Sequence, residues 1–240
     1  MEYKQQIKSK SRVANHGEVF TSKKIVNDML DLVKQETERI ESRFLEPACG
    51  NGNFLAEILE RKLAVVKAKY GKSESEYKKY AFIAVTSIYG VELLQDNVEE
   101  CRQRLFDIFC REILKNSKII SNYEKERYLE SILYVFTKNI LCGNALTLHK
   151  VDAEALDTEE PIIFSEWNFT FGDLVKRRDY RLDVLLKENA DANSLDATMS
   201  LFDDENSYQN WDIDSITGKF IPKPLQEFKP IEYWRVQENG

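Results

Sequence analysis

The first regular pattern in the chain is a run of apolar residues at helical spacing between Ser22 and Glu38. Apolar residues three and four positions apart lie on one face of an α-helix, and that face packs against a core. Thr21 or Ser22 stands at the expected N-cap, because a hydroxyl there accepts a hydrogen bond from the first helical turn. We therefore expect one helix whose buried face consists of Ile25, Met29, Leu32 and Val33.

The central part of the chain alternates short apolar segments with longer helical patterns. The expected strands are Arg43–Glu46, Ser87–Glu92 and Asn139–Ala145. The expected helices between them are Phe54–Val66, Asn97–Leu114 and Tyr123–Phe136. Parallel strands need crossover connections, and helices supply them. The pattern predicts an α/β fold with a largely parallel sheet flanked by helices.

The pattern changes after residue 150. Asp152–Glu160 has the composition of an acidic linker, and Pro161–Phe164 is a candidate fourth strand. Asn189–Asp214 is rich in Asn, Asp and Ser, which predicts a flexible loop. Phe220–Val236 is rich in proline and aromatic residues and is expected to be extended, packed on the domain or on a partner. We expect an N-terminal arm and helix (1–42), an α/β domain (43–187), and an acidic loop with an extended C-terminal segment (188–240).

Net charge limits the classes of function. A formal charge of −7 and a pI near 5.2 argue against a protein whose main work is non-specific binding to the nucleic-acid backbone. Two local basic runs, Tyr3–Arg12 and Lys176–Arg181, leave a local contact to nucleic acid open. The simpler interpretation of both runs is solvated charge.

The sequence shows no membrane or metal signature. Its apolar runs are far shorter than the roughly 20 residues that cross a bilayer, and Met1–Arg12 lacks the apolar segment of a signal peptide. We expect a soluble, cytoplasmic protein. Four cysteines without a CxxC pair and two distant histidines support neither a zinc site nor a disulfide framework. We expect reduced thiols and no bound metal.

The string FLEPACGNGNF at residues 44–54 is the most informative for chemistry. A strand delivers an acidic residue, two glycines let the backbone approach a ligand, and a helix N-terminus offers N–H groups to an anion. Glu92 ends the next expected strand, where a carboxylate in a nucleotide-binding unit accepts hydrogen bonds from ribose hydroxyls. The alternatives are a tight turn that binds nothing and a solvated glutamate at a helix start.

Four ordered pieces of the sequence resemble a known family. They are HGEVFT at 16–21, EPACGNGNF at 46–54, YGVEL at 89–93 and GNAL at 143–146. They are similar to the GxxFTP, DPACGSGxF, acidic strand-end and GDAL motifs of adenine-specific, S-adenosylmethionine-dependent DNA methyltransferases of restriction-modification systems. The resemblance covers about residues 12 to 150. This chain departs from the motifs at Ser22, Glu46, Asn51 and Asn144, where the family usually has Pro, Asp, Ser and Asp.

The resemblance implies a Rossmann-like class I methyltransferase fold and S-adenosylmethionine as cofactor. It implies that the strand end and glycine turn surround the methionine part and that the GEVFT segment closes over it. It further implies that Glu92 binds the ribose and that Leu93 and Asn144 contact the adenine. Asparagine at 144 keeps an acceptor but loses a charge. The implied cofactor-binding residues are Phe20, Thr21, Glu46, Pro47, Ala48, Gly50, Gly52, Phe54, Glu92, Leu93, Asn144 and Ala145.

The family's catalytic signature, Asn/Asp/Ser-Pro-Pro-aromatic, is absent from this sequence. That signature supplies oriented acceptors for the target amino group, which is a poor nucleophile, and an aromatic ring for the flipped base. After the candidate fourth strand, Ser165, Asn168 and Phe169 offer polar and aromatic side chains without either proline. They are candidates for the catalytic place. The simpler interpretation is a strand that continues into an ordinary loop.

Three functions are open at this point. The first is the S-adenosylmethionine-binding subunit of a site-specific N6-adenine DNA methyltransferase, with catalysis and DNA recognition completed by a second methyltransferase or restriction polypeptide. The second is a non-catalytic S-adenosylmethionine-binding subunit with a regulatory or assembly role. The third is a methyltransferase for a substrate other than DNA, against which the upstream GEVFT motif argues.

Overall fold

The computed structural model describes residues 7–116, 122–191, 211–213 and 220–240. Its centre is a parallel sheet of three short strands, in which β2 lies between β1 and β3. The strands are β1 (Phe44–Glu46), β2 (Ile88–Glu92) and β3 (Ile140–Cys142). The predicted α/β class is confirmed, and the parallel sheet is compatible with a Rossmann-like fold.

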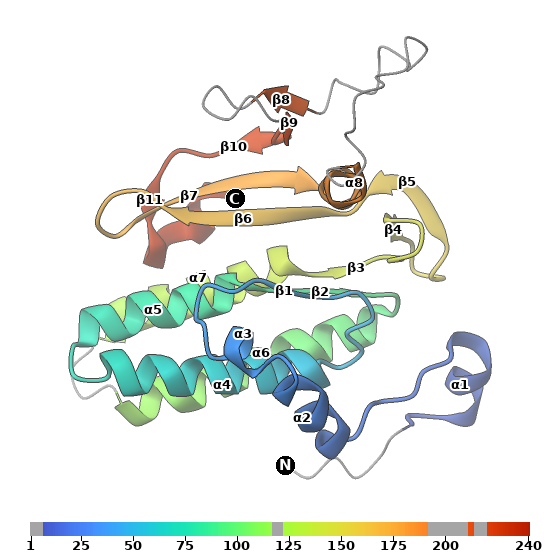
Figure 1. Cartoon of the computed structure of the whole chain (residues 1–240), viewed down its shortest axis with the longest axis horizontal. Coiled ribbons are helices and arrows are strands. Elements are labelled where there is room, and N and C mark those ends of the chain that lie inside the picture. The colour runs from blue at the N-terminus through green and yellow to red at the C-terminus, as the bar shows by residue number, and fades with distance from the viewer. Residues whose placement is uncertain (1–6, 117–121, 192–210, 214–219) are drawn as a thin grey trace.

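Four helices make the crossovers between these strands. Their bounds are α4 (Asn53–Tyr70), α5 (Glu74–Thr86), α6 (Gln95–Asn116) and α7 (Asn122–Asn139). Figure 1 shows α4 and α6 on one side of the sheet and a β-hairpin on the other, so the sheet is covered on both faces. None of the helices within the described segments is long and apolar enough to cross a membrane.

Helix α5 is an addition to the predicted elements. Its first turns are polar, which hides the helical pattern, but the Ser73 hydroxyl caps it by accepting a hydrogen bond from the Glu76 N–H. Ala81 and Phe82 are fully buried in its second half. The following strand begins at Ile88, because the residues before it stay helical.

The N-terminal helical segment divides where one helix was predicted. It consists of α2 (Lys23–Asp31) and α3 (Lys34–Thr37), and α1 (Lys10–His16) precedes them. The Ser22 N-cap is confirmed, since its hydroxyl accepts a hydrogen bond from the Ile25 N–H. The predicted buried face is wrong, because the exposed apolar residues are Ile25, Met29, Leu32 and Val33.

Two apolar stripes one residue apart explain this error. Val26 and Leu30 are buried where α2 packs on α4, and they have the same helical spacing as Ile25 and Met29. Spacing alone does not choose between adjacent stripes on one helix. The choice is made by the partner helix, which the local pattern does not contain.

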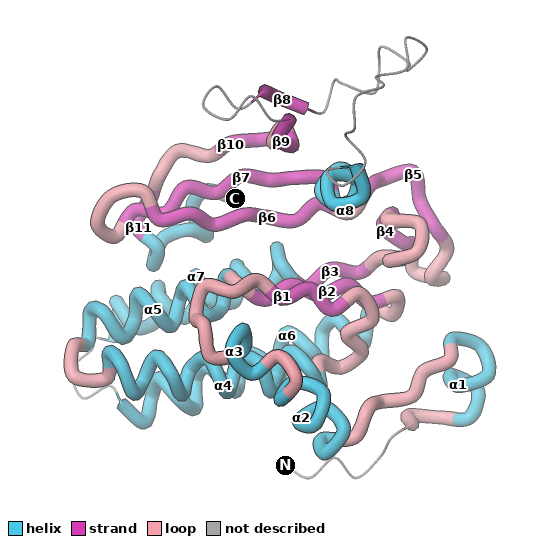
Figure 2. The backbone as a smooth tube through the Cα atoms, in the orientation of Figure 1, coloured by secondary structure: helices cyan, strands magenta, loops and turns pink. Residues whose placement is uncertain are grey.

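The chain after β3 is antiparallel. The strands are β4 (His149–Val151), β5 (Asp157–Pro161), β6 (Ile163–Phe169), β7 (Leu174–Arg181), β8 (Trp211–Ile213), β9 (Phe220–Pro222), β10 (Gln226–Glu227) and β11 (Ile231–Glu232), with helix α8 (Leu182–Asp191) and the 3-10 helix η2 (Tyr233–Asn239). β6 and β7 form a hairpin, and β7 also pairs with β10 and β11. Two further pairs are β4 with β5 and β8 with β9. Figure 2 shows the hairpin lying over the parallel sheet.

Three predictions change in this region. The candidate strand Pro161–Phe164 divides between two strands, because Pro161 ends β5 and Ile163 begins β6, which continues to Phe169. The predicted linker Asp152–Glu160 contains most of β5 and so belongs to a hairpin. The predicted flexible loop Asn189–Asp214 lies mostly outside the described residues, and its described parts are the end of α8 and the strand β8.

The C-terminal segment Phe220–Val236 packs on the domain, which is one of the two predicted outcomes. It forms short strands, and its Tyr233 ring is buried against α7. The buried Arg177 of β7 holds it further, because the guanidinium lies 3.6 Å from the centroid of the Phe228 ring. The same guanidinium makes two hydrogen bonds to Asp179, both of 2.9 Å, so its charge is compensated inside the fold.

Two apolar clusters lie on the two faces of the sheet. The larger is formed mainly by α4 to α7 and also takes in Trp167 of the hairpin. The smaller lies between the sheet and the hairpin and consists of Val91, Ile162, Phe164 and Leu182. The indole N–H of Trp167 donates to the side-chain oxygen of Asn139 at 3.0 Å, which ties the hairpin to the end of α7.

Lys62 of α4 is a fully buried cation. Its ammonium donates to the carbonyl oxygens of Ile40, at 3.0 Å, and of Ser42, and to the Ser87 hydroxyl at 2.6 Å. These acceptors belong to the segments that enter β1 and β2, so Lys62 joins the amino ends of two strands. Burial lowers the pKa of Lys62 to about 7.

Lys62 therefore predicts a pH dependence of stability. Between pH 7 and its ordinary value of 10.5, the unfolded chain binds a proton that the folded chain has lost, so raising the pH stabilises the fold. We expect the free energy of unfolding of the wild type, minus that of Lys62→Met, to rise across this window in urea titrations. The matched control is Lys67→Met, at an exposed lysine of the same helix. Parallel curves for wild type and Lys62→Met would contradict this account.

Candidate functional site

Polar side chains gather at the carboxyl ends of the three parallel strands. Glu46 ends β1, Glu92 ends β2, and Asn144 follows β3 by two residues. The carboxyl ends of parallel strands lie on the same side of the sheet, and α/β sheets bind ligands there. Other residues predicted from the sequence follow on the same ends, namely Pro47, Ala48, Gly50, Gly52, Phe54, Leu93 and Ala145. The structure brings together the three turns that the sequence pieces predicted.

The turn after β1 depends on its two glycines. Gly50 and Gly52 have φ angles of 52° and 84°, in the left-handed region that favours glycine. A Cβ on Gly52 would lie 2.6 Å from the Cys101 sulfur, and one on Gly50 would lie 3.1 Å from the Phe20 ring. Gly52 is also the N-cap residue of α4, so the turn delivers the chain directly into a helix N-terminus. A side chain at either position would be strained by the positive φ and would require Phe20 or Cys101 to shift.

Glu92 connects the turn after β1 to the start of α6. One carboxylate oxygen accepts the Gly50 N–H at 2.8 Å, and the other accepts the Leu94 N–H at 3.1 Å and the Asn97 amide at 3.2 Å. The residue is only 9% exposed, so these bonds replace most of its hydration. A carboxylate has about four acceptor positions, which leaves capacity for a hydroxyl group.

Glu46 and the residues after it are more open. Pro47 and Ala48 are exposed, and burial raises the pKa of Glu46 while a hydrogen bond from the Ala48 N–H opposes the rise. The Cys49 N–H behind them donates to the Val91 carbonyl at 2.9 Å. The turn is thus anchored on β2 and presents one carboxylate outward.

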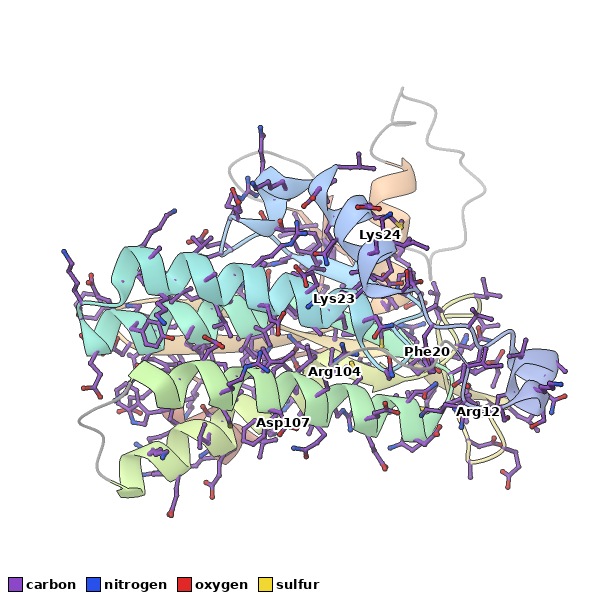
Figure 3. All side chains as sticks on the ribbon, turned by 90° about the horizontal axis from the view of Figure 1, so that it is seen from below. Arg12, Phe20, Lys23, Lys24, Arg104 and Asp107 are labelled. Atoms are coloured by element: carbon purple, nitrogen blue, oxygen red, sulfur yellow. The ribbon has the colours of Figure 1, made fainter. Side chains whose placement is uncertain are left out.

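The N-terminal arm, which we define as residues 7–22, covers the glycine turn. Phe20 is buried with its ring against Gly50, and the Thr21 carbonyl accepts the Asn53 amide at 2.8 Å. The Asn53 oxygen in turn accepts Arg104 of α6 at 2.6 Å. Figure 3 shows Phe20 and Arg104 where the arm, α4 and α6 meet. Phe20 and Thr21 therefore lie at the turn that they were predicted to close.

A chain of charged and polar contacts fastens the arm to α6. Arg12 donates two bonds of 2.7 Å to Glu18 and two bonds, of 2.6 and 3.0 Å, to Asp96. These bonds from Arg12 lower the pKa of Asp96 to about 2. Asn97 donates to both Glu18, at 2.7 Å, and Glu92, at 3.2 Å. The arm is therefore linked to Glu92 through one shared amide.

The third strand end is engaged within its own turn. The Asn144 oxygen accepts the Leu146 N–H at 3.0 Å, and its amide donates to Asp157 at 2.9 Å. Leu146 is 94% exposed, whereas Ala145 packs on the smaller core. The Asn144 side chain lies beside the carboxyl end of β3, but it is bonded within its own turn and to β5. Its predicted contact with a ligand stays a prediction.

The candidates for catalysis lie within β6, which packs over the sheet and is not part of the turns after β1, β2 and β3. The buried Ser165 hydroxyl donates to Asp179 of β7 at 2.7 Å. The Phe169 ring packs on Phe82, with centroids 6.1 Å apart. Asn168 lies in the same strand and lines a groove beside β1. The strand therefore continues to Phe169 and turns back as a hairpin, where a loop was the simpler expectation.

The two basic runs are largely paired inside the molecule. In Lys176–Arg181, all four cations contact carboxylates, at Glu227, Asp179 and Asp183. In the described part of Tyr3–Arg12, Lys8 and Arg12 pair with acids of α6 and the arm. Both runs thus have a structural use in this chain.

Several residues of the site were not predicted from the sequence. Glu18 and Asn53 were visible only as parts of motifs, while Asn97 and Arg104 gave no signal. Each acts through a partner that is distant in sequence, as in the Asn97–Glu18 contact across 79 residues. Local patterns do not report contacts of this kind.

Comparisons with known proteins give one relevant similarity. No family model and no solved structure matches the chain. It is 30% identical over 133 residues to the "Putative type II restriction enzyme and methyltransferase" of Methanocaldococcus jannaschii. The match covers 54% of this chain but 10% of that protein. The chain is therefore similar, over about half its length, to a small part of a protein named for restriction and modification.

Proposed function

We propose that this chain binds S-adenosylmethionine at the carboxyl ends of β1, β2 and β3. In this proposal it is the cofactor-binding subunit of a site-specific N6-adenine DNA methyltransferase of a restriction-modification system. The observation that carries the proposal is the Glu92 carboxylate bonded to the Gly50 N–H, with Phe20 packed on the same glycine. The similarity to the archaeal protein supports the same assignment.

The residues at the carboxyl ends of the three parallel strands fit the chemistry of this cofactor. The glycine turn lets Phe20 and Cys101 pack directly on its backbone, so the turn is compact where it meets the helix N-terminus. Glu92 offers acceptor capacity to ribose hydroxyls, and Glu46 offers a second carboxylate to a cationic amino acid moiety. S-adenosylmethionine carries such hydroxyls and charges, and when bound it supplies an electrophilic methyl group.

The chain's own residues would bind and orient. Phe20 covers the turn and excludes water from it, while Glu92 and Glu46 hold the two polar ends in one orientation. The arm would have to move away from α6 before the cofactor could enter, because the contacts between the arm and α6 lie over the site. The bond between Asn97 and Glu92 then makes closure of the arm and occupancy of the carboxylate depend on each other.

Catalysis needs groups that this sequence lacks. The chain contains no Asn/Asp/Ser-Pro-Pro-aromatic tetrapeptide, and Ser165 and Phe169 are bonded or packed inside the hairpin. We therefore propose that a second polypeptide supplies the catalytic segment and most of the DNA contacts. The archaeal relative has the length to hold both parts, because the match is a tenth of it.

The alternative of a non-catalytic binding subunit has one observation in its favour. The Asn144 side chain is bonded to Leu146 and Asp157, so a ligand must compete with an existing turn at that strand end. This arrangement would weaken the adenine contact without removing the other contacts. The two functions differ in whether the assembled complex transfers a methyl group to DNA.

Calorimetric titration with S-adenosylmethionine, with and without unmethylated duplex DNA, tests the proposal. We expect micromolar binding that does not depend on the DNA. Glu92→Ala should weaken binding by about 1.5 to 3 kcal/mol, the value of a hydrogen bond to a charged group. Glu99→Ala, at an exposed glutamate of α6, is the matched control. Equal affinities for wild type and Glu92→Ala would refute this placement of the site.

Gly50→Val tests the close approach of the backbone. The added side chain meets the Phe20 ring and the position has a φ of 52°, so we expect cofactor binding to be lost. The matched control is Gly172→Val, because Gly172 has a similar φ of 59° with open space around it. The control should lose stability but keep its affinity. Retained binding in folded Gly50→Val would place the ligand elsewhere.

Arg12→Gln tests the arm. Removing the bonds to Glu18 and Asp96 should weaken cofactor binding by about 1 kcal/mol, roughly fivefold, and make affinity less sensitive to salt. Arg111→Gln breaks comparable pairs, to Glu60 and Glu112, and serves as the control. An unchanged affinity in Arg12→Gln would mean that the arm does not close over the ligand.

A further inference from the structure

The parallel sheet has one open edge. β1 pairs with β2 only, and the Phe44 N–H donates to the Ser87 carbonyl. Backbone groups alternate sides along a strand, so the N–H and C=O of Leu45 point away from β2. In the described parts of the chain, no hydrogen bond reaches either group. The Leu45 side chain is 41% exposed beside them.

The opposite edge of the same sheet is bonded at one position. The outward carbonyl of Ile140 in β3 accepts two hydrogen bonds from the Arg102 guanidinium, of 2.9 and 2.5 Å. Burial of Arg102 lowers its pKa, which reflects the cost of placing the charge there. Natural sheets protect edges in this way, because an open edge pairs with other strands. In the described residues, one outward carbonyl of β3 is therefore bonded, whereas no hydrogen bond reaches the outward groups of Leu45 in β1.

A groove of about 500 Å³ runs beside the open edge. One wall is β1 and the other is formed by β6, β7, α8 and β9. The Leu45, Leu186 and Ile221 side chains are each about 40% exposed along it. Figure 1 shows β1 beneath the β6–β7 hairpin, with the hairpin overhanging the sheet. An apolar side chain from an added strand would have these three residues as neighbours.

We propose that the open edge of β1 and this groove bind an extended strand of a partner polypeptide, which continues the parallel sheet beyond β1. A row of outward N–H and C=O groups is chemically specific for polypeptide backbone in extended form. The three apolar side chains select an apolar residue at the position that faces the groove. The identification of the partner with the chain that carries the catalytic segment rests on the proposed function. The binding of a strand at the edge of β1 does not rest on it.

The similarity to the archaeal protein points to polypeptide as the occupant. The matched part is a tenth of that protein, so nine tenths of its chain accompany the matched part. A parallel sheet normally has its strands buried by neighbours, and three strands are few for such a sheet. A strand from a second chain would extend the parallel sheet of this protein. A longer chain can extend such a sheet with a strand of its own.

The test uses a displayed library of short random peptides as the probe and the full chain as the target. We expect selected peptides to alternate apolar and polar residues. Nuclear magnetic resonance should show that a bound peptide slows hydrogen exchange of the Leu45 amide. The Leu141 amide is the internal reference, because it already bonds to β2. A peptide that binds without protecting Leu45 overturns the proposal.

Two variants separate the edge from the groove. Leu45→Pro removes the outward N–H, and Leu186→Arg fills the groove while leaving β1 intact, so each should abolish peptide binding. Leu32→Arg is the matched control, at an apolar residue that is 85% exposed elsewhere. Loss of peptide binding in the control, or its retention in Leu186→Arg, would contradict the proposal. So would protection of Leu45 that grows with protein concentration alone, since a second copy would then occupy the edge.

Cofactor titration of the same variants separates this proposal from the proposed function. Leu186→Arg should keep the wild-type affinity for S-adenosylmethionine while it loses the peptide. Peptide binding by a wild type that binds no cofactor would support the edge and reject the proposed function. Cofactor binding with no selected peptide would support the proposed function and reject peptide binding at the edge.

Discussion

The bonds of one carboxylate hold the candidate site together. Glu92 ends the central strand, and its two oxygens accept hydrogen bonds from the turn after β1 and from the start of α6. Because the group is nearly buried, leaving these bonds unmade would cost more than making them gains. The glycine turn, the helix start and the arm are therefore positioned relative to one acceptor. Any ligand that bonds to Glu92 acts on all three.

The arm adds a second level to this arrangement. Arg12, Glu18 and Asp96 form the contacts that lie nearest the surface, and Asn97 carries their influence inward. The Asp96 carboxylate is 54% exposed and its pair with Arg12 contributes little on its own, whereas the Glu18 carboxylate is only 6% exposed and bonds both Arg12 and Asn97. The arm is therefore held mainly through Glu18.

The features that could be predicted from the sequence are those that depend on a few neighbouring residues, such as the glycine turn and the strand that ends at Glu92. Gly50 and Gly52 predict a tight turn, and both adopt left-handed angles that strain other residues, while Glu92 ends a short apolar segment that was predicted to be a strand and forms β2. The exposed stripe of α2 was mispredicted because Ile25 and Val26 begin equivalent patterns. Contacts between distant segments could not be predicted, because no repeat or spacing in the sequence encodes them.

Lys62 illustrates the same limit in the core. A lysine in an amphipathic helix reads as a surface residue, yet here its three bonds join the entries to β1 and β2. The hairpin behaves similarly, because the Trp167 bond to Asn139 fixes it on the sheet through side chains 28 residues apart. Covering the sheet by a hairpin left β1 open at its side. That opening is a property of the assembled fold and of no single segment.

The central claim is that a ligand binds through Glu92 and the turn bonded to it. The most direct measurement is the amide resonance spectrum of isotopically labelled protein during titration with S-adenosylmethionine. The account predicts large, saturable shifts of the Gly50 and Leu94 amides, because both donate to the carboxylate that the ligand would share. Saturable binding that leaves these two resonances unmoved would contradict it.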